Sequence, residues 1–471
     1  MTEDKKNKID YINLGIQISD TVRSTLGIKG MNKMIIKGDE TILTNDGATI
    51  IKSIKFTNPI ADIFKRLAES QERVIGDGTT TAVILAGQLL TNSLDLLNKR
   101  VHPTIIMSGY NLARVECLRY LSQIGETVDI EKIIRSTFGS KLNNQLSEKL
   151  TNLLKNEDVT NLKIAKFDNS SEKIELIKGF TFEGHTLNDR TPKSTIGDIA
   201  VLDLQSNLEL AKFQVTSTDE LNKIEQRQRD FKKQIVDKLK ELDVGCVFTS
   251  DTNPQFENYL TEANLMTIVV YKRDLLDNIC RATKARVIGD PTIEFKDHLG
   301  FGDISYSGQT GIIQILNEKS DIKTLVINAP TKQILDEIER SIDDVVNVMR
   351  NYGKSVVGAG AIEIELSNHL REFSKKIGGV EQIAIEKFAE SIEAIPLILA
   401  ENCGHNALEV LTLLKNQHTL GKKDLGVDAV KVISDARERG IFELASLKMH
   451  AINSSTEVAN LILKLDDIYA G

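Results

Sequence analysis

The 471-residue sequence contains no tryptophan, and aromatic residues make up only 5% of it. A chain with so few aromatic side chains is a poor stacking platform for single-stranded nucleic acid. Its formal net charge of −8 also disfavours nucleic-acid binding, which normally uses a basic domain, and provides no polybasic anchor for a membrane surface. We therefore expect neither nucleic acid nor a membrane among its partners.

Cysteines and long apolar runs are scarce as well. The four cysteines are scattered and form no CxxC pair, which argues against a zinc site or a disulfide framework. Apolar runs such as IPLILA (395–400) are far shorter than the roughly 20 residues that span a bilayer. The charged opening segment MTEDKKNKID has no apolar stretch typical of a secretory signal. We expect a cytoplasmic protein.

The length predicts two or three domains, because single cores stop growing near roughly 250–300 residues. Apolar residues follow helical spacing in 12–26, 58–75 and 82–98, and in the last of these Val83, Leu90, Leu94 and Leu97 share one face. The middle of the chain instead has short β-branched runs separated by helical stretches, and helical patterns return after about residue 330. This order predicts a helical domain built from both chain ends, with an α/β domain inserted into it.

The segment GDGTTTAVILAG, Gly76–Gly87, is the most informative motif. Glycines let a backbone approach a ligand, and a helix start directs free N–H groups and a positive dipole end at an anion. A carboxylate at Asp77 would repel a bare phosphate but suits a phosphate that carries Mg²⁺. The segment is therefore a candidate Mg-nucleotide loop, although it lacks the GxxxxGK[ST] pattern. The alternative is a plain inter-helix turn in which Thr80 or Thr81 is the N-cap.

Two more loops of similar composition lie in the N-terminal region. LGIKG (26–30) is a glycine-containing turn between a helix and a strand, and TNDGAT (44–49) is an Asp-Gly turn flanked by threonines. An Asn-Asp-Gly segment alone is usually only a turn. Three such loops in one domain indicate a composite phosphate site.

Taken together, these loops resemble those of the chaperonins, and they occur in that family's order. The resemblance rests on LGIKGMNKMI, TNDGATII, GDGTTTAVILAGQLL, DEIERSIDDVVNVMR and VVGAGAIEIELSNHL, and it covers essentially the whole chain. It points to the archaeal and eukaryotic cytosolic branch, the group II chaperonins. Within that branch, ERSIDDVVNV, GAGAIEIEL and GVEQIAIEKFAESIEAIPLILAEN are most similar to the theta subunit of the eukaryotic TCP-1 ring complex.

The resemblance implies a mostly helical equatorial ATPase domain at 1–125 and 354–471 and a small α/β intermediate domain at 126–178 and 323–353. It also implies an α/β apical domain at 179–322 with a built-in lid protrusion, near QSNLELAKFQVTSTDELNKIEQRQ. Such subunits form two stacked rings, eight subunits per ring, that enclose unfolded clients such as actin- and tubulin-like proteins. The implied function is a molecular chaperone in a hetero-oligomer, driven by ATP and Mg²⁺.

Site residues follow from the resemblance position by position. Asp77 matches the Mg²⁺ ligand, and the residues after it match the loop that holds the phosphates: Gly78, Thr79, Thr80 and Thr81. Asp46 matches a carboxylate that orients or activates the attacking water, and Asp344 matches the catalytic carboxylate of the intermediate domain.

The remaining matches surround the nucleotide. Leu26 and Gly27 match the turn that covers it, and Lys141 matches the lysine that senses the γ-phosphate. Gly360 matches a nucleotide contact, and Glu443 matches the acidic contact to ribose or base. Without the family, Asp344 and Lys141 read as surface charges, and Glu443 reads as an acid that satisfies a helix dipole.

Some positions depart from the family pattern. Ile28 stands where proline is usual, GAG replaces a triple glycine, and Leu444 replaces a frequent proline. These departures leave open a scaffold subunit that binds nucleotide and turns it over slowly. A monomeric phosphotransferase is a further alternative, although no motif indicates a pocket for a small acceptor. The candidate client-binding helices, 253–265 and 271–288, are explained equally well as covers of the α/β sheet.

Overall fold

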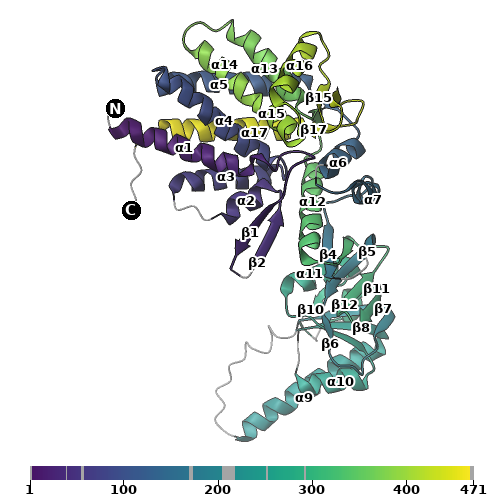
Figure 1. Ribbon diagram of the computed structural model, residues 1–471. Coiled ribbons are helices and arrows are strands. Elements are labelled where there is room, and N and C mark those ends of the chain that lie inside the picture. The colour runs from purple at the N-terminus through teal and green to yellow at the C-terminus, as the bar shows by residue number, and fades with distance from the viewer. Residues whose placement is uncertain are drawn as a thin grey trace. The chain divides into compact units, whose positions relative to one another are not determined.

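The computed structural model describes residues 3–38, 40–54, 58–139, 141–168, 173–203, 218–250, 253–290 and 293–466. The chain forms two compact units, one from residues 1–157 and 336–471 and the other from residues 158–335 (Figure 1). The first, which we call the terminal unit, combines both ends of the chain, and the second, the inserted unit, interrupts it. The finer division into equatorial, intermediate and apical domains stays a prediction.

The terminal unit is mainly helical. Its helices are α1 (Glu3–Arg23), α2 (Gly47–Ser53), α3 (Pro59–Val74), α4 (Thr79–Asn98), α5 (Pro103–Ile124), α6 (Ile130–Gly139), α7 (Asn144–Leu154), most of α12 (Lys332–Arg350), α13 (Ala361–Ser374), α14 (Glu381–Ile392), α15 (Ala394–Asn402), α16 (Ala407–Thr419) and α17 (Ala445–Lys464). The helices predicted around residues 12–26, 58–75 and 82–98 are therefore present as α1, α3 and α4.

Short strands accompany these helices. They form the antiparallel hairpin of β1 (Lys33–Lys37) and β2 (Glu40–Thr44), the three-stranded sheet of β3 (Glu126–Thr127), β14 (Lys354–Val357) and β17 (Phe442–Leu444), and the hairpin of β15 (Leu425–Asp428) and β16 (Val432–Asp435). The expectation that helical patterns return after about residue 330 is wrong at β14, β15, β16 and β17. These four strands are only three or four residues long, too short to produce a clear alternating pattern.

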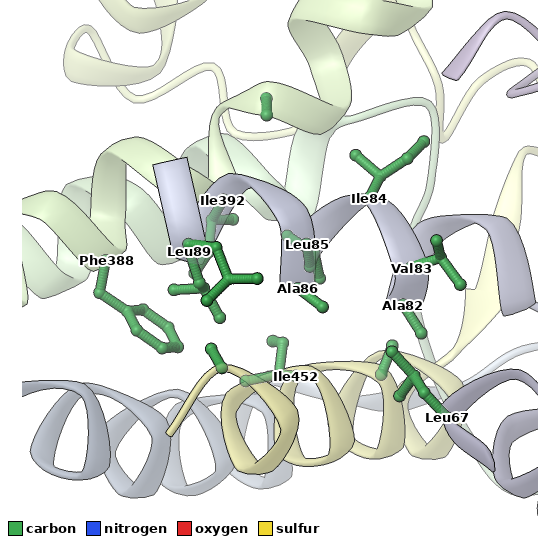
Figure 2. Close-up of a cluster of buried hydrophobic side chains, with 14 of the residues drawn as sticks. Leu67, Ala82, Val83, Ile84, Leu85, Ala86, Leu89, Phe388, Ile392 and Ile452 are labelled. Carbon is green, nitrogen blue, oxygen red and sulfur yellow. The ribbon is translucent and has the colours of Figure 1, made fainter. Parts of the chain in front are cut away.

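Helix α4 is the centre of this unit. It packs against α1, α3, α14 and α17, so that apolar side chains on all its sides are buried, including Val83, Ile84, Leu85 and Leu89 (Figure 2). The prediction of a single apolar face at Val83, Leu90, Leu94 and Leu97 is therefore too narrow, because neighbours surround the helix. This burial fixes the start of α4, which follows the GDG turn.

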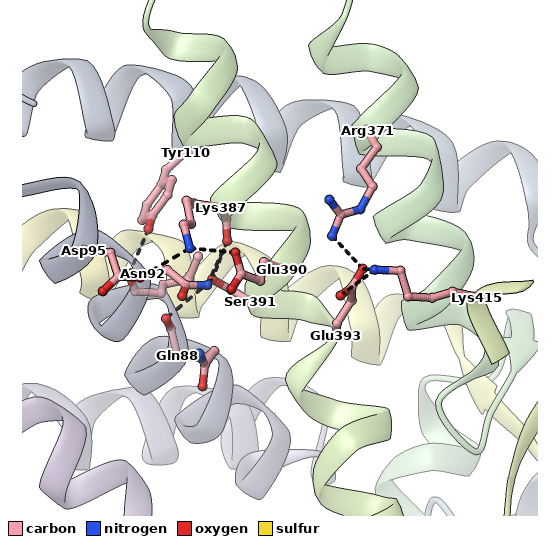
Figure 3. A network of polar contacts seen from close by, with 11 residues as sticks. Gln88, Asn92, Asp95, Tyr110, Arg371, Lys387, Glu390, Ser391, Glu393 and Lys415 are labelled. Carbon is pink, nitrogen blue, oxygen red and sulfur yellow. Dashed lines mark hydrogen bonds and ion pairs between the residues drawn. The ribbon is translucent and has the colours of Figure 1, made fainter. Parts of the chain in front are cut away.

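A buried polar network joins α4 to α14 and α13 to α16 (Figure 3). Asn92 donates to Ser391 Oγ at 2.8 Å, and the Glu393 carboxylate, only 6% exposed, accepts from Ser367, Arg371 and Lys415. Burial would raise the pKa of Glu393, but these three donors lower it overall. The carboxylate is thus held in its ionised form between helices far apart in sequence.

The inserted unit is built on a ten-stranded mixed sheet in the order β4-β13-β5-β12-β11-β7-β8-β9-β6, with β10 also paired to β7. The strands are β4 (Leu162–Asp168), β5 (Lys173–Glu183), β6 (His185–Thr186), β7 (Ser194–Leu202), β8 (Val244–Thr249), β9 (Met266–Val269), β10 (Val287–Ile288), β11 (Gly300–Ser307), β12 (Ile312–Leu316) and β13 (Lys323–Ala329). The short β-branched runs noted in the middle of the chain are confirmed as strands, among them β7, β8, β9 and β13.

Helices cover both faces of part of this sheet. They are α9 (Thr218–Glu241), α10 (Pro254–Glu262), α11 (Arg273–Thr283) and the 3-10 helix η1 (Phe295–His298). Ile199 and Val201 of β7 lie in one apolar cluster with α11, whereas Ala200 and Leu202 lie in another with α9 and α10. This alternation is that of a strand buried on both faces, and it confirms the α/β class.

The predicted lid segment lies largely outside the described residues, which resume at α9. Across the parts of the chain that the structure describes, we find no helix with both the length and the apolar character needed to span a bilayer.

Candidate functional site

The GDG turn joins α3 to α4 in the terminal unit. Gly78 is the N-cap of α4 and has a left-handed backbone with φ of 77°, and an added Cβ would lie 2.7 Å from Leu447. Glycine has no side chain with which to cap the helix, so the first N–H groups of α4 are left to an external acceptor. The alternative in which Thr80 or Thr81 is the N-cap is wrong, because Gly78 is the N-cap and the helix already begins at Thr79.

The three threonines of this turn differ in burial. Thr79 and Thr81 are 5% and 8% exposed and belong to the packed interior, whereas Thr80 is more accessible. Gly47 of α2 lies against Thr80, since an added Cβ there would be 2.6 Å from the Thr80 hydroxyl. Thr80 is therefore the threonine best placed to offer its hydroxyl to a phosphate, beside the Asp46–Gly47 segment.

Lys141, just after α6, lies between two carboxylates from distant parts of the chain. Its Nζ donates to Asp77 Oδ1 at 3.1 Å and forms a short ion pair with Asp344 of α12. All three side chains are between 18% and 25% exposed. The structure thus brings together three of the predicted site residues, and the interpretation of Asp344 and Lys141 as plain surface charges is wrong.

This cluster carries more negative than positive charge. Burial raises the pKa of Asp344 to about 8; Lys141 opposes the shift, while Asp77 and Asp46 add to it. For Lys141, burial would lower the pKa, but Asp344 and Asp77 raise it overall. Lys141 therefore pairs with two carboxylates, the nearby Asp46 adds further negative charge, and the site can accept a further cation.

Asp46 caps a helix in addition to its predicted role beside the attacking water. As the N-cap of α2, its Oδ2 accepts from the backbone N–H and from the hydroxyl of Thr49, both at 2.7 Å. Both bonds use the same oxygen, so Oδ1 remains for a water molecule. The tight-turn interpretation of TNDGAT and its role beside the phosphates are thus compatible.

Gly76 allows α12 to approach the turn closely. It has φ of 85°, and an added Cβ would overlap the side chain of Asn347, one helical turn after Asp344. A larger residue would push α12 away from the turn. The first glycine of GDG therefore sets the position of Asp344, and the second provides the helix start.

Glu443 is the middle residue of β17 and is not a free acid. Lys448, only 5% exposed, bridges Glu443 Oε2 at 2.6 Å and Glu363 Oε1 at 2.7 Å. Burial raises the pKa of Glu443, with Lys448 opposing and Glu363 and Asp77 adding to the shift. The interpretation of Glu443 as an acid that satisfies a helix dipole is incomplete, because its partner is a lysine side chain.

The remaining predicted contacts meet on α15. Gly27 has φ of 85° and lies against Leu399, and Gly360 has φ of 82° and lies against Pro396 and Leu399. Asn402 holds the turn by donating to the carbonyl of Leu26 at 2.9 Å. One helix thus positions both the turn predicted to cover a nucleotide and the glycine start of α13.

The site residues fit a magnesium-bound nucleotide. Within the described ranges, no three His, Cys, Asp or Glu side chains converge to hold a metal by themselves. Mg²⁺ is commonly held by one or two carboxylates together with substrate phosphates, and Asp77 beside a free helix start offers that combination. The surplus of carboxylates supplies the charge that such a cation would neutralise.

Sequence reasoning missed Gln71, Glu363 and Lys448. Gln71 is completely buried on the inner face of α3, and its side chain donates to the carbonyl of Asp77 at 2.9 Å. A polar residue on the apolar face of a helix is a visible signal, but its partner is not. The pairing of Glu363 with Lys448 spans 85 positions and depends on the fold.

Comparisons with known proteins cover almost the whole chain. The profile of the TCP-1/cpn60 chaperonin family matches residues 18–470. The chain is 34% identical to the thermosome subunit beta of Archaeoglobus fulgidus, across 96% of this chain and 90% of that protein. It is 33% identical to the thermosome subunit 1 of Haloferax volcanii, across 98% of this chain and 88% of that protein. The chain therefore belongs to the TCP-1/cpn60 chaperonin family.

Proposed function

We propose that this chain is an ATP-hydrolysing subunit of a group II chaperonin ring. The observation that carries the proposal is the position of Lys141 between Asp77 and Asp344, next to the uncapped start of α4. Three segments far apart in sequence meet there, and their residue types suit phosphoryl transfer. Such a reaction needs positioning and charge neutralisation more than covalent help.

The backbone N–H groups at the start of α4 and the Thr80 hydroxyl would bind the phosphates, and Lys141 would lie beside the terminal one. Mg²⁺, held by Asp77, would neutralise charge that develops on the phosphate oxygens. Asp46 and Asp344 would orient the attacking water and accept its proton as its oxygen bonds to the γ-phosphorus. The bond from that phosphorus to the bridging oxygen then breaks, and ADP leaves.

Asp344 and Asn347 belong to α12, which packs on the turn through Gly76. Movement of α12 would take Asp344 away from the phosphates without dismantling the binding loop. Hydrolysis would therefore wait for α12 to close, a common gating device. In the proposed cycle, this closure is coupled to enclosure of an unfolded client by the lid.

The relatives above are thermosome subunits, and we propose that this chain likewise assembles into a double ring, with eight subunits per ring. The β1–β2 hairpin supports assembly, because Met34 and Ile36 are 67% and 73% exposed on a strand that a neighbouring subunit could cover. The theta-like segments named above favour a cytosolic hetero-oligomer. Sedimentation of the native complex tests assembly, since a monomer of 52.3 kDa would separate at once from a ring.

The direct test is ATP hydrolysis by the purified complex, with wild type compared to Asp344→Ala in this chain. A loss of this subunit's share of turnover, with nucleotide binding and ring size unchanged, is the expected result. Unchanged turnover in an intact ring would favour the second candidate, a scaffold subunit that binds nucleotide without hydrolysing it. The exposed Ile28, where the family usually has proline, is the observation that favours this alternative.

A further inference from the structure

Gln71 contacts each residue of the turn that leads from α3 to Asp77. Its backbone carbonyl accepts from the N–H groups of Ile75 and Gly76, at 3.0 and 3.2 Å. Its side-chain Nε2 donates to the carbonyl of Asp77 at 2.9 Å. A single completely buried residue thus holds three successive backbone groups up to the proposed Mg²⁺ ligand.

The orientation of this amide is itself fixed from α17. His450 Nδ1 lies 2.6 Å from Gln71 Oε1, which is an acceptor, so His450 donates a proton there. Because Oε1 faces His450, Nε2 must face the Asp77 carbonyl. Burial lowers the pKa of His450, and the neutral ring with a proton on Nδ1 is sufficient for this bond.

The Asp77 carboxylate depends on the backbone that Gln71 holds. Asp77 Oδ1 accepts from Gly78 N–H at 2.8 Å and from Lys141. Rotation of the Asp77 peptide would move this carboxylate and the N–H groups at the start of α4 together. A residue that fixes the Asp77 carbonyl therefore also fixes the groups proposed to bind Mg²⁺ and the phosphates.

We propose that Gln71 and His450 are positioning residues for the Mg²⁺-nucleotide loop, acting on Asp77 through its backbone carbonyl. This inference rests on the proposed function, since it concerns the same loop. Neither residue needs to touch the nucleotide. Together they connect α17 to the turn, so that the metal ligand is oriented before any ligand binds.

The test compares ADP affinity with and without Mg²⁺ by calorimetry on the purified full chain. Gln71→Glu preserves size but places an acceptor against the Asp77 carbonyl. We expect it to reduce the affinity gained from Mg²⁺ by about tenfold, the effect of losing about one hydrogen bond. His450→Leu should reduce the affinity gained from Mg²⁺ by a smaller factor. His450→Gln, which keeps a donor, should gain as much affinity from Mg²⁺ as the wild type.

Asn92→Asp is the matched control, because it makes the same amide-to-acid change at a buried bridge that does not touch the turn. It should reduce stability and leave the gain from Mg²⁺ unchanged. If Gln71→Glu fails to fold, the contrast between His450→Leu and His450→Gln decides the question.

The outcomes separate this inference from the proposed function. A wild-type chain that gains affinity from Mg²⁺, with variants that gain the same amount, overturns the positioning role alone. A similar loss in Asn92→Asp also overturns it, because the effect would then follow from general destabilisation. A wild-type chain that binds no Mg-nucleotide overturns both proposals.

Discussion

Two lysines in the terminal unit each lie between two carboxylates, yet the two clusters differ in access and charge. Lys141 is 18% exposed beside Asp77 and Asp344, and Asp46 adds to the negative charge. Lys448 is 5% exposed, and Glu363 beside it is 4% exposed. The Lys141 cluster is open enough to admit a ligand, and its carboxylates outnumber its single lysine. The second is closed at Glu363 and holds α17 to α13.

The same residue types therefore serve two purposes, and the surroundings decide which. A closed ion pair resists the loss of either partner, because the remaining charge stays buried without compensation. An open pair with surplus carboxylates can exchange its lysine contacts for a metal and phosphates. The predictions below test this difference, beginning with the largest effect.

Replacing Lys448 with methionine should reduce the free energy of unfolding by about 3–5 kcal/mol, since Glu363 would remain buried without its partner. Urea unfolding of the full chain measures this change. Lys387→Met is the control, because Lys387 also bridges two carboxylates, Asp95 and Glu390, but both are about half exposed. Its cost should stay below about 1 kcal/mol. Equal costs would show that the two bridges are alike.

Replacing Lys141 with methionine should cost about 2 kcal/mol of stability, less than at Lys448 because this cluster is partly open to water. Addition of Mg²⁺ should recover most of this loss, since the metal can neutralise the carboxylates left behind. Thermal unfolding with and without Mg²⁺ measures the recovery. The same recovery in Lys448→Met would contradict the distinction between an open and a closed cluster.

Replacing Gly76 with alanine should reduce ATP turnover about tenfold, because the new Cβ would push Asn347 and hence Asp344 away from the turn. Gly421→Ala is the matched control, since Gly421 has a similar φ of 89° and open space around its Cβ position. It carries the backbone cost of about 1–2 kcal/mol without the contact. Adding Asn347→Gly to Gly76→Ala should restore part of the turnover; a double variant no better than the single one would exclude the clash.

Glu393 differs from the carboxylates of the Lys141 cluster, because a single carboxylate is surrounded there by several donors. Its pKa is lowered on folding, so its contribution to stability is complete above the ordinary glutamate range and is lost as the pH falls through the folded-state value. Glu393→Gln should therefore reduce stability by about 1–2 kcal/mol near neutral pH and flatten its decline in acid. Unfolding curves between about pH 3 and pH 7 test this. An unchanged acid slope would mean that other carboxylates dominate.

The sequence predicted the main helices, the inserted α/β region and the loops of the site, because helical spacing, β-branched runs and glycine turns are local signals. It missed the very short strands β14–β17, where three or four residues carry no readable period. It also predicted one apolar face for α4, since the number of neighbours around a helix is not a local property.

The sequence also did not predict which residues from distant segments pair with each other. The resemblance to the family named Asp77, Lys141 and Asp344, but the contacts among them depend on three distant segments. Lys448 and Glu363 read as ordinary helical charges, and Gln71 as an isolated polar residue on an apolar face. Only the fold shows which acid faces which base, and therefore which cluster is open.

The split origin of the terminal unit has a consequence for synthesis of the protein. Helix α4 needs α14 and α17 to cover it, yet the whole inserted unit and both of those helices are translated after it. At about 5–20 residues per second, its apolar surface waits on the order of tens of seconds on the ribosome. The nascent chain of this chaperonin subunit is therefore a candidate client of other folding helpers before it can assist any protein itself.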